Sequence, residues 1–150
     1  MEQKEVELYK KFPMILQKKL IDGDVKFPDD INFDYEKFLA YRMVARTDND
    51  FSDITREDMK SYAELGKKPK RVQGFDESDP DYYSASFYTN VEKLKNSLKF
   101  PRRNKKIIQG YIYQEGGPQK TVVKTTHVSW WLFSDVTVDN FTYYKEDKNG

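Results

Sequence analysis

The chain has 150 residues, and its 26 basic and 25 acidic side chains leave a formal net charge of +1. This balance counts against a protein that binds DNA or RNA through unspecific phosphate contacts, because such proteins carry a large basic excess. Cysteine is absent, which excludes disulfides, thiolate nucleophiles and cysteine-ligated zinc. Aromatic residues make up 15% of the chain, so we expect one domain whose core is built mainly from rings.

The N-terminal segment carries apolar residues at helical spacing. They are Val6, Tyr9, Leu16 and Leu20. Pro13 interrupts the series and suits the first turn of a second helix, through Ile21, which Gly23 closes as a left-handed cap. The pattern predicts one kinked helix or two short ones, followed by a turn-rich loop. The segment lacks a secretory h-region and no apolar run approaches the length of a membrane span, so we expect a cytoplasmic protein.

Two short elements are expected after this loop. Asp34 can cap a short helix that ends at Leu39. Residues 41–46 alternate as a strand does, although a helix is the competing interpretation there. Residues 48–59 begin like a calcium-binding loop, but they lack the glycine required at the sixth position and the glutamate required at the twelfth. We therefore expect a solvated turn and no metal site.

The next helix and the loop behind it have clear local signals. Thr55, followed three residues later by Asp58, resembles a capping box and predicts a helix that ends near Gly66. Residues 67–81 are rich in charges, proline and glycine, which is typical of an exposed loop.

A strand and a helix follow this loop. Residues 83–88 alternate as a strand should. Thr89 and Glu92 form a capping box that predicts a helix over residues 90–99. Pro101 then prevents the helix from continuing.

The stretch from Lys106 to Phe133 holds the strongest β pattern in the chain. Two β-rich runs flank Glu115 to Pro118, which we interpret as the turn of a central hairpin. One face of the second run holds Val128, Trp130 and Leu132, and the other holds His127, Trp131 and Phe133. A strand that is apolar on both faces is usually covered on both sides. A last strand is expected over residues 141–144.

Together these elements predict a single α+β domain. Residues 1–32 form a helical N-terminal segment and its loop, and residues 33–146 form the sheet-containing core. In this core two further short helices pack on a mainly antiparallel sheet that is rich in aromatic residues.

The single histidine, His127, is the first candidate for chemistry. Any imidazole chemistry must use it, and Asp135 is the nearest following carboxylate in the sequence that could serve as its partner. The alternative is a half-buried histidine that a backbone carbonyl satisfies. We expect the structural role.

A run of basic residues between the last predicted helix and the hairpin is the main candidate for binding. It consists of Lys99, Arg102, Arg103, Lys105 and Lys106, and no acidic run adjoins it. Because the helix ends before Pro101, these side chains should fan out over a turn. With Tyr83 they can line a face for an anionic partner, whereas the alternative is a solvated loop end. We favour an acidic protein partner over nucleic acid.

A second function is suggested by the order of other polar residues. Arg42 lies on an early strand, and Ser84 and Ser86 lie on a later strand that leads into a helix. This arrangement resembles a small ADP-ribosyltransferase. The resemblance implies NAD as the cofactor and a cleft near Arg42, Ser84 and His127. In that family a late glutamate, often in a Glu-x-Glu pair, completes the site. This sequence has no such pair after the second helix, and the stand-ins are Glu115, in the predicted hairpin turn, and Asp135.

We therefore expect a small, soluble, non-catalytic binding protein that needs no cofactor. The composition, rich in Lys, Tyr, Asp and Asn, would fit a bacterial or phage protein, including a mobile-element protein that acts on host or defence machinery. The alternative is the nucleotide-dependent transferase. The enzyme is favoured if Arg42, Ser84, Ser86 and a carboxylate converge on one concave pocket.

Overall fold

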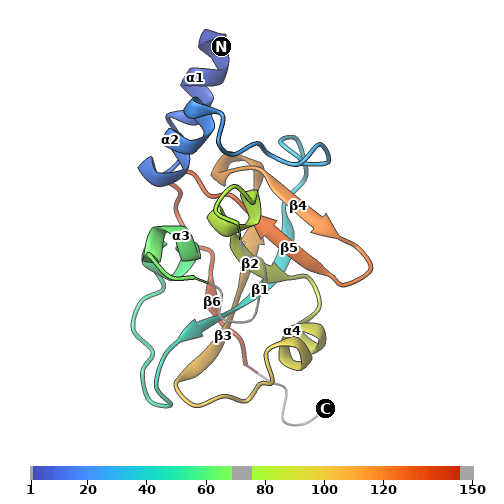
Figure 1. Cartoon of the computed structure of the whole chain (residues 1–150). Coiled ribbons are helices and arrows are strands. Elements are labelled where there is room, and N and C mark those ends of the chain that lie inside the picture. Colours follow the sequence, from blue (N-terminus) through green and yellow to red (C-terminus); the bar gives the residue numbers. More distant parts are fainter. Residues whose placement is uncertain (1, 69–75, 146–150) are drawn as a thin grey trace.

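The computed structural model describes residues 2–68 and 76–145, and it contains one antiparallel sheet with helices at its ends and on one face (Figure 1). The predicted α+β class is confirmed. Parts of two predictions, the loop over residues 67–81 and the end of the core at residue 146, lie outside the described residues. No helix within the described ranges is long and apolar enough to cross a membrane.

The six strands pair in the order β4-β5-β2-β1-β3-β6, and all neighbours are antiparallel. The strands are β1 (Phe38–Ala45), β2 (Ala85–Tyr88), β3 (Lys105–Ile112), β4 (Gln119–Val122), β5 (His127–Trp130) and β6 (Thr142–Tyr143). The α-helices are α1 (Gln3–Tyr9), α2 (Met14–Asp22), α3 (Tyr62–Leu65) and α4 (Val91–Ser97). Three 3₁₀ turns complete the elements: η1 (Arg56–Met59), η2 (Pro80–Tyr83) and η3 (Gln114–Gly116).

The N-terminal segment forms two short helices, as predicted. Pro13 occupies the N-cap of α2, one residue before the first helical turn, and its φ of −53° already suits a helix. Gly23 ends α2 with a φ of 79°, the left-handed conformation that glycine adopts without strain. In Figure 1 both helices stand at one end of the sheet.

The helix predicted from Asp34 to Leu39 is wrong, whereas the strand predicted over residues 41–46 is confirmed. The strand begins earlier, because Phe38 already pairs with Ile112 of β3 in the sheet register. An eight-residue ladder between β1 and β3 satisfies these backbone groups better than one short helical turn does.

The helix predicted after Thr55 is broken into η1 and α3. The capping box of Thr55 and Asp58 is present, but Lys60 is extended, with ψ at 138°, and ends the first turn. Ser61 then starts a second capping box with Glu64. Each box therefore begins its own short segment, and the two do not merge into one helix.

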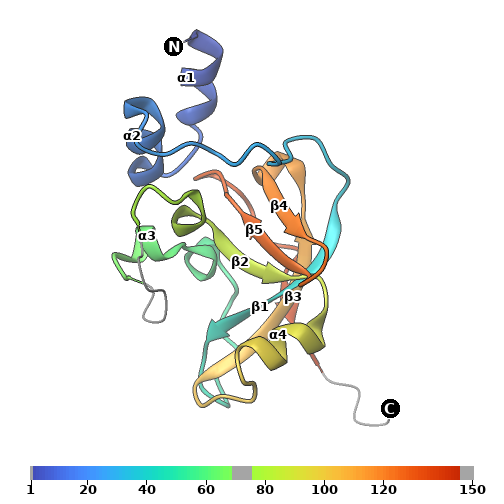
Figure 2. The same cartoon turned by 45° about the vertical axis from the view of Figure 1, so that its right-hand side comes forward.

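Helix α4 is confirmed but has a different cap. Asn90, not Thr89, is the N-cap, and its side chain accepts a hydrogen bond from the Lys93 N–H at 3.1 Å. The helix is therefore shorter than predicted at both ends. It packs against β1 and β2, and Figure 2 shows it in front of the lower part of the sheet.

The prediction placed the central hairpin at the wrong residues. Glu115 to Pro118 does not join neighbouring strands, since β3 pairs with β1 and β6 while β4 lies at the opposite edge of the sheet. The true hairpin joins β4 to β5 through the turn at residues 123–126. The segment after β3 instead crosses from one side of a curled sheet to the other.

The sheet is curled so strongly that the segment before β1 reaches the far edge. Asn32 and Gln119 exchange two backbone hydrogen bonds, of 2.8 and 3.0 Å, on the outer side of β4. The Tyr35 hydroxyl donates to the Gly117 carbonyl at 2.6 Å. These bonds tie the start of β1 to the crossing segment.

Two hydrophobic clusters flank the sheet, and adjacent tryptophans belong to different clusters. The sheet cluster comprises Ala40, Val44, Met59, Ala85, Phe87, Ile108, Ile112, Val128, Trp130, Leu132, Val138 and Phe141. The helix cluster comprises Phe12, Leu16, Leu20, Val25, Ala63, Tyr83 and Trp131. Trp130 donates from Nε1 to the Gly117 carbonyl at 3.1 Å, and Trp131 donates to the Pro80 carbonyl at 2.8 Å. The predicted alternation of residues 128–132 is confirmed.

Candidate functional site

Arg42, the arginine of the transferase alternative, uses its guanidinium for hydrogen bonds within the fold. Its guanidinium donates to the carbonyls of Asp58 at 2.9 Å, Lys60 at 3.2 Å and Ser86 at 2.9 Å. The same group lies 5.5 Å from the centre of the Phe87 ring. Burial lowers the pKa of Arg42 to about 10, so the side chain still carries its charge at neutral pH. Arg42 thus ties the loop around η1 to β2.

Ser86 and His127 form a close pair on neighbouring strands. The Ser86 Oγ and the His127 Nε2 are 2.6 Å apart, and the Tyr88 ring stands edge-on to the imidazole at 5.2 Å. Burial lowers the pKa of His127, and the charge of Asp81 offsets this only partly, so the imidazole is neutral at pH 7. A hydroxyl therefore satisfies this ring, where we expected a backbone carbonyl. Within the described residues no group bonds to Nδ1.

The residues of the transferase alternative do not converge on one cleft. Arg42 packs on Phe87, on the sheet-cluster face, whereas Ser86 and His127 lie on the opposite face because side chains alternate along a strand. The Ser84 hydroxyl donates to the carbonyl of the residue three positions earlier. Within the described residues, Arg42 and the Ser86–His127 pair are therefore not presented together, and this geometry gives the transferase alternative no support.

Four cations follow α4, and we call them the basic turn: Lys99, Arg102, Arg103 and Lys105. In the described part of the chain none of the four makes an ion pair or a side-chain hydrogen bond. The neighbouring Lys106 has partners within the fold, because its Nζ donates to the Asp48 carbonyl at 2.7 Å and lies 4.3 Å from the centre of the Phe51 ring.

The backbone of the basic turn is anchored at both ends although its side chains are free. The Phe100 N–H donates to the Lys95 carbonyl at 2.8 Å, which joins the turn to the end of α4. The Arg46 N–H donates to the Asn104 carbonyl at 2.8 Å, which joins it to the end of β1. Since α4 ends before all four cations, they lie along a turn and not along a helical stripe. The turn therefore holds its cations in a defined place.

The charge of the chain is unevenly distributed around this turn. Residues 93–106 contain seven basic side chains and no acidic one. The rest of the sequence holds 19 basic and 25 acidic side chains, so a formal charge of +7 in this segment stands against −6 elsewhere. A net charge near zero thus conceals a molecule with one strongly positive segment.

Tyr83, which the sequence suggested as a further contact residue, is not available at the surface. Its side chain belongs to the helix cluster, the residue is 5% exposed, and its hydroxyl donates to the Glu77 carbonyl at 2.7 Å. It lies in η2 and not in β2. Its burial removes it from the candidate binding residues.

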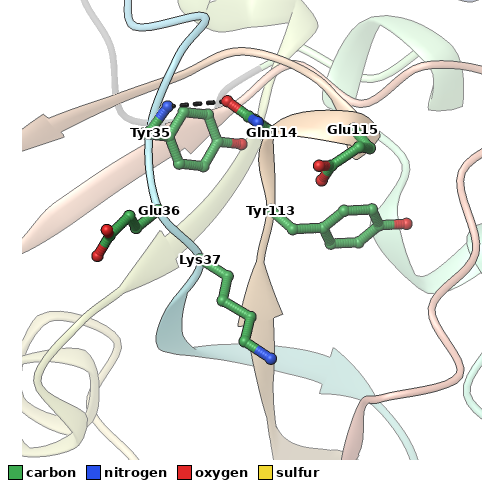
Figure 3. Close-up of a pocket in the computed structure, with 6 residues that line it drawn as sticks. All are labelled: Tyr35, Glu36, Lys37, Tyr113, Gln114 and Glu115. Atoms are coloured by element: carbon green, nitrogen blue, oxygen red, sulfur yellow. Dashed lines mark hydrogen bonds between the residues drawn. The ribbon is translucent and has the colours of Figure 1, made fainter.

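A third site, which sequence reasoning missed, is an open depression that we call the tyrosine hollow (Figure 3). Its main part, about 500 Å³, is lined by Tyr35, Glu36, Lys37, Tyr113, Gln114 and Glu115. A second part of about 290 Å³ shares three of these residues and adds Tyr111 and Asn140. The alternation of Tyr111 and Tyr113 was visible in the sequence, but nothing there placed Tyr35 beside them.

Comparison with known proteins gives no relative to guide the choice among these sites. No family model matches the chain, and neither the curated proteins nor the solved structures contain a significant match. Among the described residues, no group of three or more His, Asp or Glu side chains could hold a metal ion. The function is therefore argued from geometry and charge.

Proposed function

We propose that this is a non-catalytic binding protein whose basic turn contacts an acidic surface of a protein partner. The observation that carries the proposal is the set of four unpaired cations on an anchored turn. Cations that a protein uses for its own fold are paired, as Arg46 is with Asp58 at 2.8 Å. The cations of the basic turn have no such internal role and remain available to a partner.

The anchored backbone supports binding over simple solvation. A partner that meets these cations does not have to order the main chain, so binding costs little backbone entropy. The positive segment belongs to a chain that is otherwise negatively charged, and this uneven distribution of charge would orient an acidic partner during its approach. Such charges act mainly on the association rate and weaken with salt.

A protein partner is favoured over a nucleic acid by what surrounds the turn. Unspecific binding to single strands combines cations with exposed aromatic rings on which bases stack. The tyrosine proposed for that role, Tyr83, is buried.

The test is charge reversal at two positions, Arg102→Glu together with Arg103→Glu. The probe is a fluorescent oligoglutamate peptide, and its binding is measured by anisotropy at about 20 and about 200 mM salt. We expect the double variant to bind on the order of tenfold more weakly at low salt, with less difference at the higher salt. Circular dichroism should show unchanged folding, because neither side chain has a partner within the described chain.

The matched control is Lys18→Glu together with Lys26→Glu, which changes the net charge by the same amount at two exposed lysines outside the positive segment. Equal weakening in both double variants would mean that only total charge matters, and would overturn the proposal. Tighter binding of a single-stranded oligonucleotide than of the peptide would also contradict it and would indicate a nucleic-acid partner instead.

A further inference from the structure

The tyrosine rings of the hollow are held in fixed positions. The Tyr35 hydroxyl donates to the Gly117 carbonyl at 2.6 Å, and the Tyr113 hydroxyl donates to the Thr137 carbonyl at 2.8 Å. The Tyr113 ring also stands edge-on to Trp130 at 5.7 Å, so its far side packs on the core. Burial raises the pKa of Tyr35, with a further contribution from the nearby Glu115 charge, and keeps its hydroxyl protonated. The hollow is therefore preorganised.

Two charged side chains, Glu115 and Lys37, line both parts of the hollow. Glu115 lines both parts of the hollow, yet it makes no hydrogen bond or ion pair with any described residue. Lys37 lines the same two parts but does not pair with it. Figure 3 shows Glu115 on the side towards which Tyr35 and Tyr113 point, whereas the Glu36 carboxylate turns away. One unpaired carboxylate thus stands beside aromatic rings.

The protein already places a cation on this surface. The Lys37 Nζ lies 4.9 Å from the centre of the Tyr111 ring, within the distance at which ring and ammonium attract each other. Tyr111 itself is 42% exposed, so this ring can accept a contact from solvent. The internal contact shows that an ammonium group fits against the rings of the hollow.

We propose that the tyrosine hollow binds an alkylammonium or guanidinium group, of the kind carried by lysine and arginine. Rings supply cation–π attraction, and Glu115 supplies the opposite charge. The depression is open to solvent, which suits a side chain presented from outside better than an enclosed cofactor. This site lies on another surface and attracts the opposite charge from the basic turn, so it does not depend on the function proposed above.

The experiment is an NMR titration of the ¹⁵N-labelled full chain with three probes. They are the peptide acetyl-Gly-Lys-Gly-amide, its norleucine counterpart, which has the same shape without the charge, and butylammonium chloride. We expect the lysine peptide to shift the amide signals of residues 35–37 and 111–115, with a dissociation constant on the order of millimolar. The norleucine peptide should leave them in place.

Two isosteric or near-isosteric variants give effects of opposite sign. Glu115→Gln should weaken binding of the lysine peptide about two- to fivefold, because it removes the attracting charge. Lys37→Met should strengthen it by a similar factor, since it removes a competing cation and frees the Tyr111 ring. Glu36→Gln is the matched control and should change the affinity less than Glu115→Gln, because its carboxylate turns away from the rings.

Two results would overturn the proposal: equal shifts with the norleucine peptide, which would make the hollow an apolar site, or no shift with any charged probe. Stronger binding of the peptide than of butylammonium would assign the cation to a protein partner, and the reverse order would assign it to a free amine. The basic turn is not involved in either result, so Arg102→Glu with Arg103→Glu should leave the peptide affinity within about twofold.

Discussion

Trp130 and Trp131 are neighbours in sequence, but they serve two parts of the molecule that are built differently. Trp130 lies in the sheet cluster, whose members extend from Ala40 to Phe141. Trp131 lies in the helix cluster, where four of the seven buried residues come from the segment between Phe12 and Val25. The buried strand residues of the sheet cluster come from β1, β2, β3 and β5, so this cluster depends on the register of four strands that are distant in sequence. The helix cluster is largely one local segment that packs on the rest of the fold.

The N-terminal helices meet the rest of the fold through contacts with residues around Phe133. Phe12 meets Phe133 with ring centres 5.0 Å apart, and the Ser134 N–H donates to the Lys11 carbonyl at 2.8 Å. Terminal segments that pack on one side of a fold can open on their own. We infer that the helices α1 and α2 are able to unfold while the sheet stays intact, and that the reverse does not occur.

The largest effect should come from the sheet cluster. Trp130→Ala removes a fully buried ring together with its hydrogen bond to Gly117, and should cost about 3–5 kcal/mol of unfolding free energy. Most small domains have only about 5–15 kcal/mol to lose, so all regions should melt together at a much lower temperature. Thermal unfolding followed by near- and far-ultraviolet circular dichroism measures this. A melting temperature equal to that of the wild type would show that the sheet cluster is not the main core.

A smaller global effect is expected from the helix cluster. Phe12→Ala also empties a buried site, with the exposed fraction of Phe12 at 1%, but the loss should appear mainly as local opening of α1 and α2. Hydrogen exchange should show faster exchange at residues 3–22, with little change in β1 and β3. If the strands lose protection to the same degree as the helices, the two clusters form one cooperative unit and the comparison fails.

The smallest effect on the free energy of unfolding should come from replacing His127, which belongs to neither cluster. Its pKa is lowered in the folded protein, so protonation favours the unfolded chain. The stabilisation is complete above the unfolded pKa of about 6.5 and is lost as the pH falls through the lower folded value. When the pH falls from about 7.5 to about 5, the wild type should lose more unfolding free energy than His127→Gln does.

Urea unfolding of both proteins at both pH values measures this difference. Since His127 is the only histidine, no other imidazole contributes. Identical pH profiles for the two proteins would contradict the lowered pKa.

Some local signals in the sequence were reliable, although the caps predicted at Asp34 and Thr89 were wrong. Gly23 caps α2 as predicted, and the box of Thr55 with Asp58 is present although it starts only a 3₁₀ turn. Pro13 lies at the start of α2, one residue earlier than predicted. The alternation of Trp130 and Trp131 correctly indicated a segment that is covered on both sides. These features depend on backbone geometry within a few residues, which a sequence records directly.

Features that depend on distant partners were not predictable in the same way. Gly116 and Gly117 indicate a sharp change of direction, but not which strands it connects. Gly117 is required because a Cβ there would lie 2.0 Å from the Trp131 carbonyl oxygen, and its φ is 137°. Likewise Arg42 has the residue type of a catalytic arginine, and only the fold shows that its donors bond to three carbonyls.

The same distinction applies to the candidate sites. The basic turn is contiguous, so the sequence indicated its place and its shape; whether it binds a partner stays a prediction. The tyrosine hollow joins Tyr35 to Gln114, which is 79 residues away in the sequence, and its existence depends on how the sheet curls. No composition or spacing rule connects two such segments.

The exchange of hydrogen bonds between Asn32 and Gln119 has a consequence for how this protein behaves at high concentration. An unpaired strand edge is a template on which other chains can add strands and aggregate. Here the Asn32 backbone occupies part of the outer edge of β4, the same strand carries Lys120, and the opposite edge strand, β6, is only two residues long. These features limit the length of edge that another chain could pair with, so we expect a chain with 15% aromatic residues to be less prone to edge-to-edge assembly while Asn32 stays in place.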